Sequence, residues 1–123
     1  MYSDLLIFQK TYDLLVWMMP VVNKFPKDQK FVLGQRLENK VLDILNLIIK
    51  ANSKLAKEEY FYAISLGLDE ARVYVRLSKD LRFISIKQYE VFALRLNEIG
   101  KLFGGWAGSR KIDHVNSKIH MEG

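Results

Sequence analysis

Residues 85–106 read SIKQYEVFALRLNEIGKLFGGW, and this stretch shows the period of an α-helix most clearly. Ser85 and Gln88 stand three residues apart, which is the spacing of a capping box at a helix start. Apolar side chains then recur at steps of four, three, four and three, so they share one helical face. They are Phe92, Leu96, Ile99, Phe103 and Trp106. Because Trp106 falls on this stripe, we expect the helix to continue through Gly104 and Gly105 to about Ala107.

Three further helical patterns precede this one, and no strand-like alternation is long enough to compete with them. We expect helices over residues 4–24, from the FPK turn to about residue 51, and from residues 54–58 to about residue 83. The second pattern has apolar residues at Phe31, Leu37, Val41, Ile44, Leu45 and Ile48. The third predicted helix would be about 45 Å long, the longest of the four.

The first predicted helix carries two apolar stripes. One contains Phe8, Tyr12, Leu15, Met19 and Val22, and the other contains Ile7, Leu14, Met18 and Val21. A helix that is apolar nearly all round is usually covered on several sides. In a chain of 123 residues, we therefore expect a second subunit to cover part of this helix.

Four helices of about 20 to 30 residues joined by short turns predict an all-α fold, an antiparallel up-down-up-down four-helix bundle. We expect this bundle to span residues 1–109. The segment 110–123, RKIDHVNSKIHMEG, loses the helical period and is expected to be a flexible C-terminal tail.

The stretch FPKDQKFVLGQRLEN, residues 25–39, places a glycine inside the second predicted helix. Gly34 costs about 1 kcal/mol relative to alanine in a helix interior. We expect a neighbouring helix, in the same chain or in the next subunit, to approach closely there. Arg36 points away from the face of Gly34 and is a candidate contact for a partner.

Composition excludes several classes of protein. Half of the residues are apolar and 27% are charged, as in ordinary globular domains. The absence of cysteine excludes disulfide chemistry and agrees with a cytoplasmic location. The longest apolar run, residues 14–22, is too short to cross a bilayer, and no signal peptide is visible.

No motif of an active site is present. We therefore expect no enzymatic activity and no cofactor, because neither a phosphate-binding glycine loop nor an activated nucleophile is indicated. His114 and His120 stand six residues apart, which is not the helical spacing of a zinc pair, and no metal site is predicted.

Positive charge is concentrated between Ala71 and Lys87, where five Lys or Arg residues stand against one acid, Asp80. Arg72, Arg76 and Lys79 share one face of the third predicted helix, with Arg82 near its edge. Such a row could follow a phosphate backbone. It could equally be a solvated face whose cations pair with Asp69 and Asp80, and the residues favour neither interpretation.

Aromatic residues at helical spacing are expected to belong mostly to the core rather than to stack on bases. This set comprises Tyr60, Phe61, Tyr62, Tyr74, Tyr89, Phe92, Phe103 and Trp106.

Two runs of the chain resemble a known family. They are WMMPVVNKFPKDQKFVLGQRLENKVLDILNLIIKAN, residues 17–52, and ARVYVRLSKDLRFISIKQYEVFALRLNEIGKLFGGW, residues 71–106. They are similar to the four-helix-bundle accessory variability determinant (Avd) proteins of diversity-generating retroelements. The proteins encoded in intervening sequences of 23S ribosomal RNA genes are related to these. The similarity covers about Tyr12 to Ser109. It is strongest in the segment FPKDQKFVLGQR and in the segment that runs from RVYVRLSKDL to GGW.

The resemblance implies a basic bundle that assembles into a ring-like homopentamer. It further implies association with a reverse transcriptase and with RNA or DNA during mutagenic copying of a template repeat. The positions carried forward as the nucleic-acid or partner-binding set are Arg36, Arg72, Arg76, Lys79 and Arg82. The alternative is a structural or scaffolding homo-oligomer of the intervening-sequence type without a nucleic-acid role.

Overall fold

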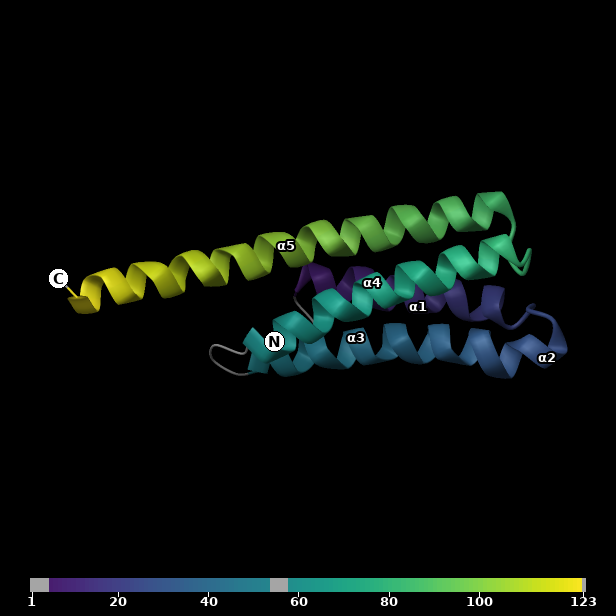
Figure 1. Cartoon of the computed structure of the whole chain (residues 1–123), viewed down its shortest axis with the longest axis horizontal. Helices are drawn as coiled ribbons and strands as arrows, with labels where there is room; N and C mark the ends of the chain where they lie inside the picture. Colours follow the sequence, from purple (N-terminus) through teal and green to yellow (C-terminus); the bar gives the residue numbers. More distant parts are fainter. Residues whose placement is uncertain (1–4, 54–57, 123) are drawn as a thin grey trace.

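Four long helices run back and forth in the structure, a computed structural model that describes residues 5–53 and 58–122 (Figure 1). Side chains of the last helix are described as far as Gly108. Every regular element within these ranges is helical, which confirms the all-α prediction. The elements are α1 (Leu6–Val22), α2 (Lys27–Gln29), the π-helical turn η2 (Lys30–Gly34), α3 (Gln35–Ser53), α4 (Glu58–Asp80) and α5 (Ile86–Glu122).

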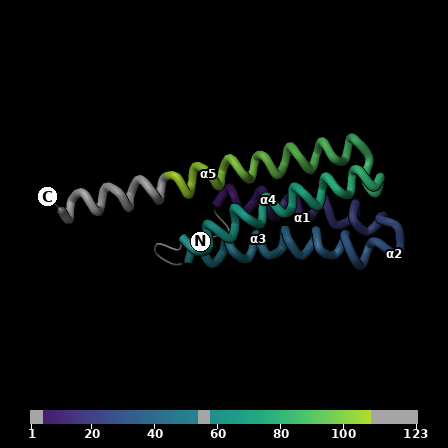
Figure 2. Tube along the Cα trace, in the orientation of Figure 1, coloured from purple at the N-terminus to yellow at the C-terminus, as the bar shows by residue number. Residues whose placement is uncertain are grey.

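The four long helices form an up-down-up-down bundle (Figure 2). α1 packs against α3 and α5, and α4 packs against the same two helices, so the bundle has four sides. Each helix turns its apolar stripe inward, and the innermost side chains exclude water completely. These fully buried residues include Leu14 and Met18 of α1, Leu37 and Ile48 of α3, Ile64 of α4, and Phe92 of α5.

The two apolar stripes of α1 are covered unequally within the chain. Most of the stripe of Ile7, Leu14 and Met18 is buried, whereas Tyr12 of the other stripe is 48% exposed. Ile7, Leu14, Leu15, Met18 and Val22 are all buried, because α1 has α3 on one side and α5 on the other. The expectation that a second subunit covers part of this helix stays a prediction. A helix that contacts two neighbours simply requires a wide apolar face.

The start of α5 confirms the predicted capping box. The backbone N–H of Gln88 donates to Ser85 Oγ at 3.0 Å, and the backbone N–H of Ser85 donates to Gln88 Oε1 at 2.9 Å. The two side chains thereby satisfy N–H groups that have no partner within the helix.

The last helix is longer than predicted. It continues through Gly104 and Gly105, as expected, but then extends beyond Ala107 to Glu122. At 37 residues α5 is the longest helix, so the prediction that the third helix would be longest was wrong. Neither Gly104 nor Gly105 has a positive φ, and without a left-handed residue the helix has no glycine stop there. The expected flexibility of segment 110–123 stays a prediction.

α4 ends at Asp80, before the predicted end near Phe83. The backbone N–H of Phe83 donates to the carbonyl of Ser78 at 2.8 Å, and that of Arg82 donates to Lys79 at 2.9 Å. These two bonds form a Schellman motif, which requires a left-handed residue. Arg82 takes that position, with φ 63°. The predicted start at residues 54–57 lies outside the described residues.

The second predicted helix is divided rather than continuous. α2 and the π-turn η2 precede α3, and Phe31 within η2 is 67% exposed instead of belonging to the core. At about 100° per residue, Phe31 lies roughly 120° from Leu37, whereas Leu33 and Gly34 fall within about 60° of it. Leu33 and Gly34 are accordingly the buried residues of this turn.

Gly34 confirms the expected close approach, and the neighbour belongs to the same chain. A Cβ at Gly34 would lie 2.8 Å from Val22 Cγ1 and 3.4 Å from Phe25 Cδ2. Val22 is β-branched and 1% exposed, so it has little freedom to move away. The absence of a side chain at Gly34 therefore lets the start of α3 pack against the end of α1.

We predict that Gly34→Ala lowers the free energy of unfolding by about 1–3 kcal/mol, because the new methyl group overpacks a closed contact. Gly104→Ala is the matched control, since no atom lies within 4 Å of its Cβ position. It should stabilise the chain by about 0.5–1 kcal/mol through helix propensity. Urea denaturation measures both. Adding Val22→Ala to Gly34→Ala should cost less than the sum of the single changes, and strict additivity would contradict the contact.

Candidate nucleic-acid or partner surface

Three of the predicted cations lie along the seam between α4 and α5. The Arg72 guanidinium lies against Gly100 of α5, where a Cβ would come within 2.5 Å of Nη2. The Lys79 ammonium lies 4.5 Å from the centre of the Tyr89 ring, also on α5. Arg76 stands between them in the sequence and is the most exposed of the three, with 75% of its side chain accessible. The helical spacing places the three cations on one face of α4, and the tertiary structure brings Arg72 and Lys79 of this row beside α5.

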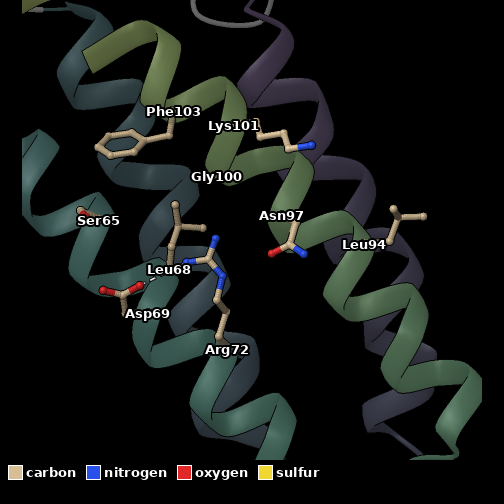
Figure 3. A pocket seen from close by; sticks show the side chains of 9 residues that line it. All are labelled: Ser65, Leu68, Asp69, Arg72, Leu94, Asn97, Gly100, Lys101 and Phe103. Carbon is tan, nitrogen blue, oxygen red and sulfur yellow. Dashed lines mark hydrogen bonds and ion pairs between the residues drawn. The ribbon is translucent and has the colours of Figure 1, made fainter. Parts of the chain in front are cut away.

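Acidic side chains accompany this row, which also agrees with the sequence. Arg72 Nη1 is 3.1 Å from Asp69 Oδ1, and a dashed line marks this bond in Figure 3. Asp80 serves two cations, at 3.9 Å from Arg76 Nε and 3.5 Å from Lys79 Nζ. Exposed pairs of this kind contribute at most about 1 kcal/mol each. Phosphate groups could therefore replace these carboxylates as partners of the row at little cost.

An open groove of ≈ 460 Å³ lies at the Arg72 end of the row. Asp69 and Arg72 reach into it from α4, and Asn97 points toward Arg72 from α5 (Figure 3). Lys101 lies at the outer edge and points away from Arg72. The remaining lining residues are Ser65, Leu68, Leu94, Gly100 and Phe103. The groove combines two cations, one carboxylate and an amide with apolar side chains, and it is open to solvent. Such a groove suits contacts with a larger partner better than enclosure of a small ligand.

Sequence reasoning did not single out Gly100, Asn97 or Lys101 for this surface. One signal was available, because a glycine inside a strong helical pattern indicates close approach of another group. At Gly100 that group is the arginine side chain itself. Asn97 and Lys101 carried no comparable signal, since exposed polar residues are ordinary on a helix surface.

Arg82 and Arg36 lie apart from this row. Arg82 occupies the turn between α4 and α5, and Arg36 lies in the first turn of α3. Both are exposed, and neither has an ion pair with any residue that the structure describes. The five predicted residues therefore form two groups: a row on the α4–α5 seam, and two arginines in segments near the connections between helices.

Comparison with known proteins places the chain in a family. The family model described as bAvd-like matches residues 5–110. The chain belongs to the bAvd-like family. No curated protein matches it. The matched range contains all four long helices up to the described end of the α5 side chains, together with all five predicted residues.

Most aromatic residues of this bAvd-like chain pack into the core, as expected. Trp106 stacks edge-on against Phe61 with 4.8 Å between ring centres, and Trp17 contacts Phe92 in the same manner. Tyr62 is the exception within the predicted set, with 73% exposure.

Neither a metal cluster nor a spanning helix occurs in the described part of the bAvd-like chain. No group of three or more His, Cys, Asp or Glu side chains comes together there. No helix there combines the length and the apolar character needed to cross a membrane. His114 and His120 have side chains outside the described ranges.

One carboxyl of the bAvd-like chain is clearly perturbed. Partial burial raises the pKa of Glu38 in α3, and the nearby Lys30 ammonium of η2 opposes this effect. Since the folded state holds the proton more tightly than the unfolded state, this group favours folding below its ordinary pKa. Its ionised form weakens folding as the pH rises through the folded-state value.

We predict that Glu38→Gln raises the melting temperature at pH 7, because the amide carries no charge to be desolvated. The advantage should shrink as the pH falls below the ordinary glutamate pKa and the native carboxyl becomes neutral as well. Thermal denaturation at several pH values tests this. Asp43→Gln, at an exposed position of α3, is the control. A lower melting temperature for Glu38→Gln at pH 7 would show that attraction to Lys30 outweighs desolvation.

Proposed function

We propose that this bAvd-like protein is a non-enzymatic accessory subunit of a diversity-generating retroelement, acting in the cytoplasm. In this role it binds RNA or DNA and docks a reverse transcriptase during mutagenic copying. The observation that carries the proposal is the row of Arg72, Arg76 and Lys79 beside α5, because its carboxylate partners are exposed and readily exchanged for phosphates.

Exposed apolar side chains support self-association. Tyr62, Leu66, Val73 and Leu77 follow one another on α4 at steps of four, seven and four, so they form one stripe, and each is at least 44% exposed. Within one chain nothing in the described ranges covers them. A contiguous exposed apolar stripe is typical of a protein interface. We assign this stripe to contacts between copies of the chain in a homopentameric ring, with the cation row free for other partners.

One observation supports a second candidate function. Each of the three cations has a carboxylate within 4 Å, so the row is partly neutralised before any phosphate arrives. A structural or scaffolding homo-oligomer would retain the same ring and show no affinity for nucleic acid at physiological salt. The two functions differ in salt-dependent binding, which is directly measurable.

We predict that replacing Arg72, Arg76 and Lys79 by Gln weakens RNA or DNA binding at least about tenfold. The slope of log K against log salt should also fall by roughly 2–3, since three phosphate contacts are lost. Fluorescence anisotropy over a salt series measures both quantities. Lys10, Lys40 and Lys50 replaced by Gln form the matched control, because they remove the same charge from α1 and α3. If both triple variants lose the same affinity, the loss comes from the change in net charge and not from the position of the row.

We predict that the purified chain has the mass of five copies, and that a reverse transcriptase from the same source co-purifies with it. Replacing Leu66 and Leu77 by Glu should reduce the mass toward one copy, because charges would be buried in the subunit contact. Asn46→Glu, exposed on α3, is the control. Light scattering after size exclusion measures the mass. A monomeric wild-type chain would contradict both candidate functions.

A further inference from the structure

Two connections of the chain meet at one end of the bundle. α2 and the turn between α4 and α5 lie together there (Figure 1). The Phe25 and Phe83 rings join the two connections, with 5.6 Å between their centres. We call the residues 23–38 and 79–90 the end surface.

The end surface holds two departures from regular helix geometry. The first is the π-turn η2, in which Phe31 and Val32 are exposed and Leu33 and Gly34 are buried. The second is Arg82, the only non-glycine residue with a positive φ in the described part of the chain. Glycine is the usual residue at such a position because a Cβ is sterically disfavoured there. Short π-turns are frequent at functional sites, whereas a left-handed residue is an ordinary part of a Schellman cap that is here an arginine instead of the usual glycine.

Positive charge gathers on the same surface. Its two segments contain seven Lys or Arg residues and four Asp or Glu residues, so they carry three of the five net charges of the whole chain. Five of these cations have no ion pair within the described ranges. They are Lys24, Lys27, Arg36, Arg82 and Lys87. Of the acids, Asp80 is occupied by Arg76 and Lys79, and Glu38 is partly buried near Lys30. Asp28 and Glu90 are exposed.

Phe31 is an aromatic ring displayed among these cations. It is 67% exposed, and the Lys30 ammonium lies 5.6 Å from its centre. Folding does not require this ring, because the core beside it is completed by Leu33, Gly34 and Phe25. A cationic surface with an accessible aromatic ring matches a single-stranded nucleic acid, which offers phosphates together with unstacked bases. A duplex offers the phosphates but keeps the faces of its bases covered.

We propose that the end surface binds single-stranded nucleic acid, with a base stacked on Phe31 and the phosphates near Lys27, Lys30 and Arg82. The inference rests on the proposed nucleic-acid function and adds to it a preference for single strands. In this arrangement the α4 row supplies attraction to any phosphate backbone. The end surface supplies the discrimination between a single strand and a duplex. Arg82 stands two residues after the end of α4 and is exposed.

The test compares a fluorescein-labelled oligo(dT) strand with a labelled DNA duplex of the same length, by anisotropy, on the full-length chain. Phe31→Ala should weaken binding of the strand by about 5- to 150-fold, the range expected for loss of one base–aromatic stack. Binding of the duplex should remain within about twofold of the wild type. Phe31→Trp should retain binding of the strand, because indole offers an equivalent ring face.

Two controls isolate the ring. Val32→Ala removes the exposed apolar neighbour in the same π-turn, and Tyr12→Ala removes an exposed aromatic side chain on α1. Neither should alter the preference for the strand. Arg82→Gly separates binding from folding, because it should raise the melting temperature by relieving the left-handed arginine while weakening binding of both probes.

Several results would overturn the inference. If Phe31→Ala binds the strand as tightly as the wild type, no base stacks on Phe31. Equal losses on strand and duplex would show a cationic surface that binds anions in general, as a contact with an acidic protein would use. A change of assembly mass in Phe31→Ala would assign the ring to a subunit contact. If the wild-type chain binds neither probe, the proposed nucleic-acid function fails. If it binds both and only the α4 variants weaken binding, the inference about Phe31 fails alone.

Discussion

The contact between Gly34 and Val22 is the constraint on which the rest of the structure depends. It fixes how closely the start of α3 approaches the end of α1, and the hydrogen atom of glycine is all that fits. α3 and α5 both flank α1. The close contact at Gly34 therefore sets the distance between α1 and α3 at this end of the bundle. The same segment then passes through η2, which leaves Phe31 outside the core. The segment that packs closely at Gly34 therefore also exposes the Phe31 ring on the surface.

The cations on the surface of this protein differ in whether a carboxylate lies within ion-pair distance. The cations of the α4–α5 seam are paired with exposed carboxylates, whose attraction is modest in water. The cations of the end surface mostly lack such partners. A partner carrying phosphates would therefore contact two kinds of surface. On the α4–α5 seam its phosphates would have to replace carboxylates, whereas most cations of the end surface have no carboxylate to be replaced.

The sequence was most informative where a local pattern has a single physical explanation. The stripe from Phe92 to Trp106 and the Ser85 capping box predicted α5 correctly at its start. The same reasoning predicted the pairs of Arg72 and Arg76, because helical spacing alone brings their carboxylates within reach. It failed for Phe31 and for the end of α5. Apolar character was taken as a sign of burial in the first case, and loss of periodicity as a sign of helix termination in the second.

The amino-acid sequence by itself determined the helical class, the family, the row of cations on α4 and the need for close packing at Gly34. The helical class and the row follow from spacing along one chain segment, which a helix converts directly into a face. The family follows from resemblance over long runs of the chain, and the packing at Gly34 follows from the cost of glycine inside a helix. Only the tertiary structure decided which helix meets which. It placed Gly100 under Arg72, gave α1 two neighbours, and brought Phe25 against Phe83 in the turn that holds Arg82. These arrangements join residues far apart in the sequence, and no periodicity within a single helix contains that information.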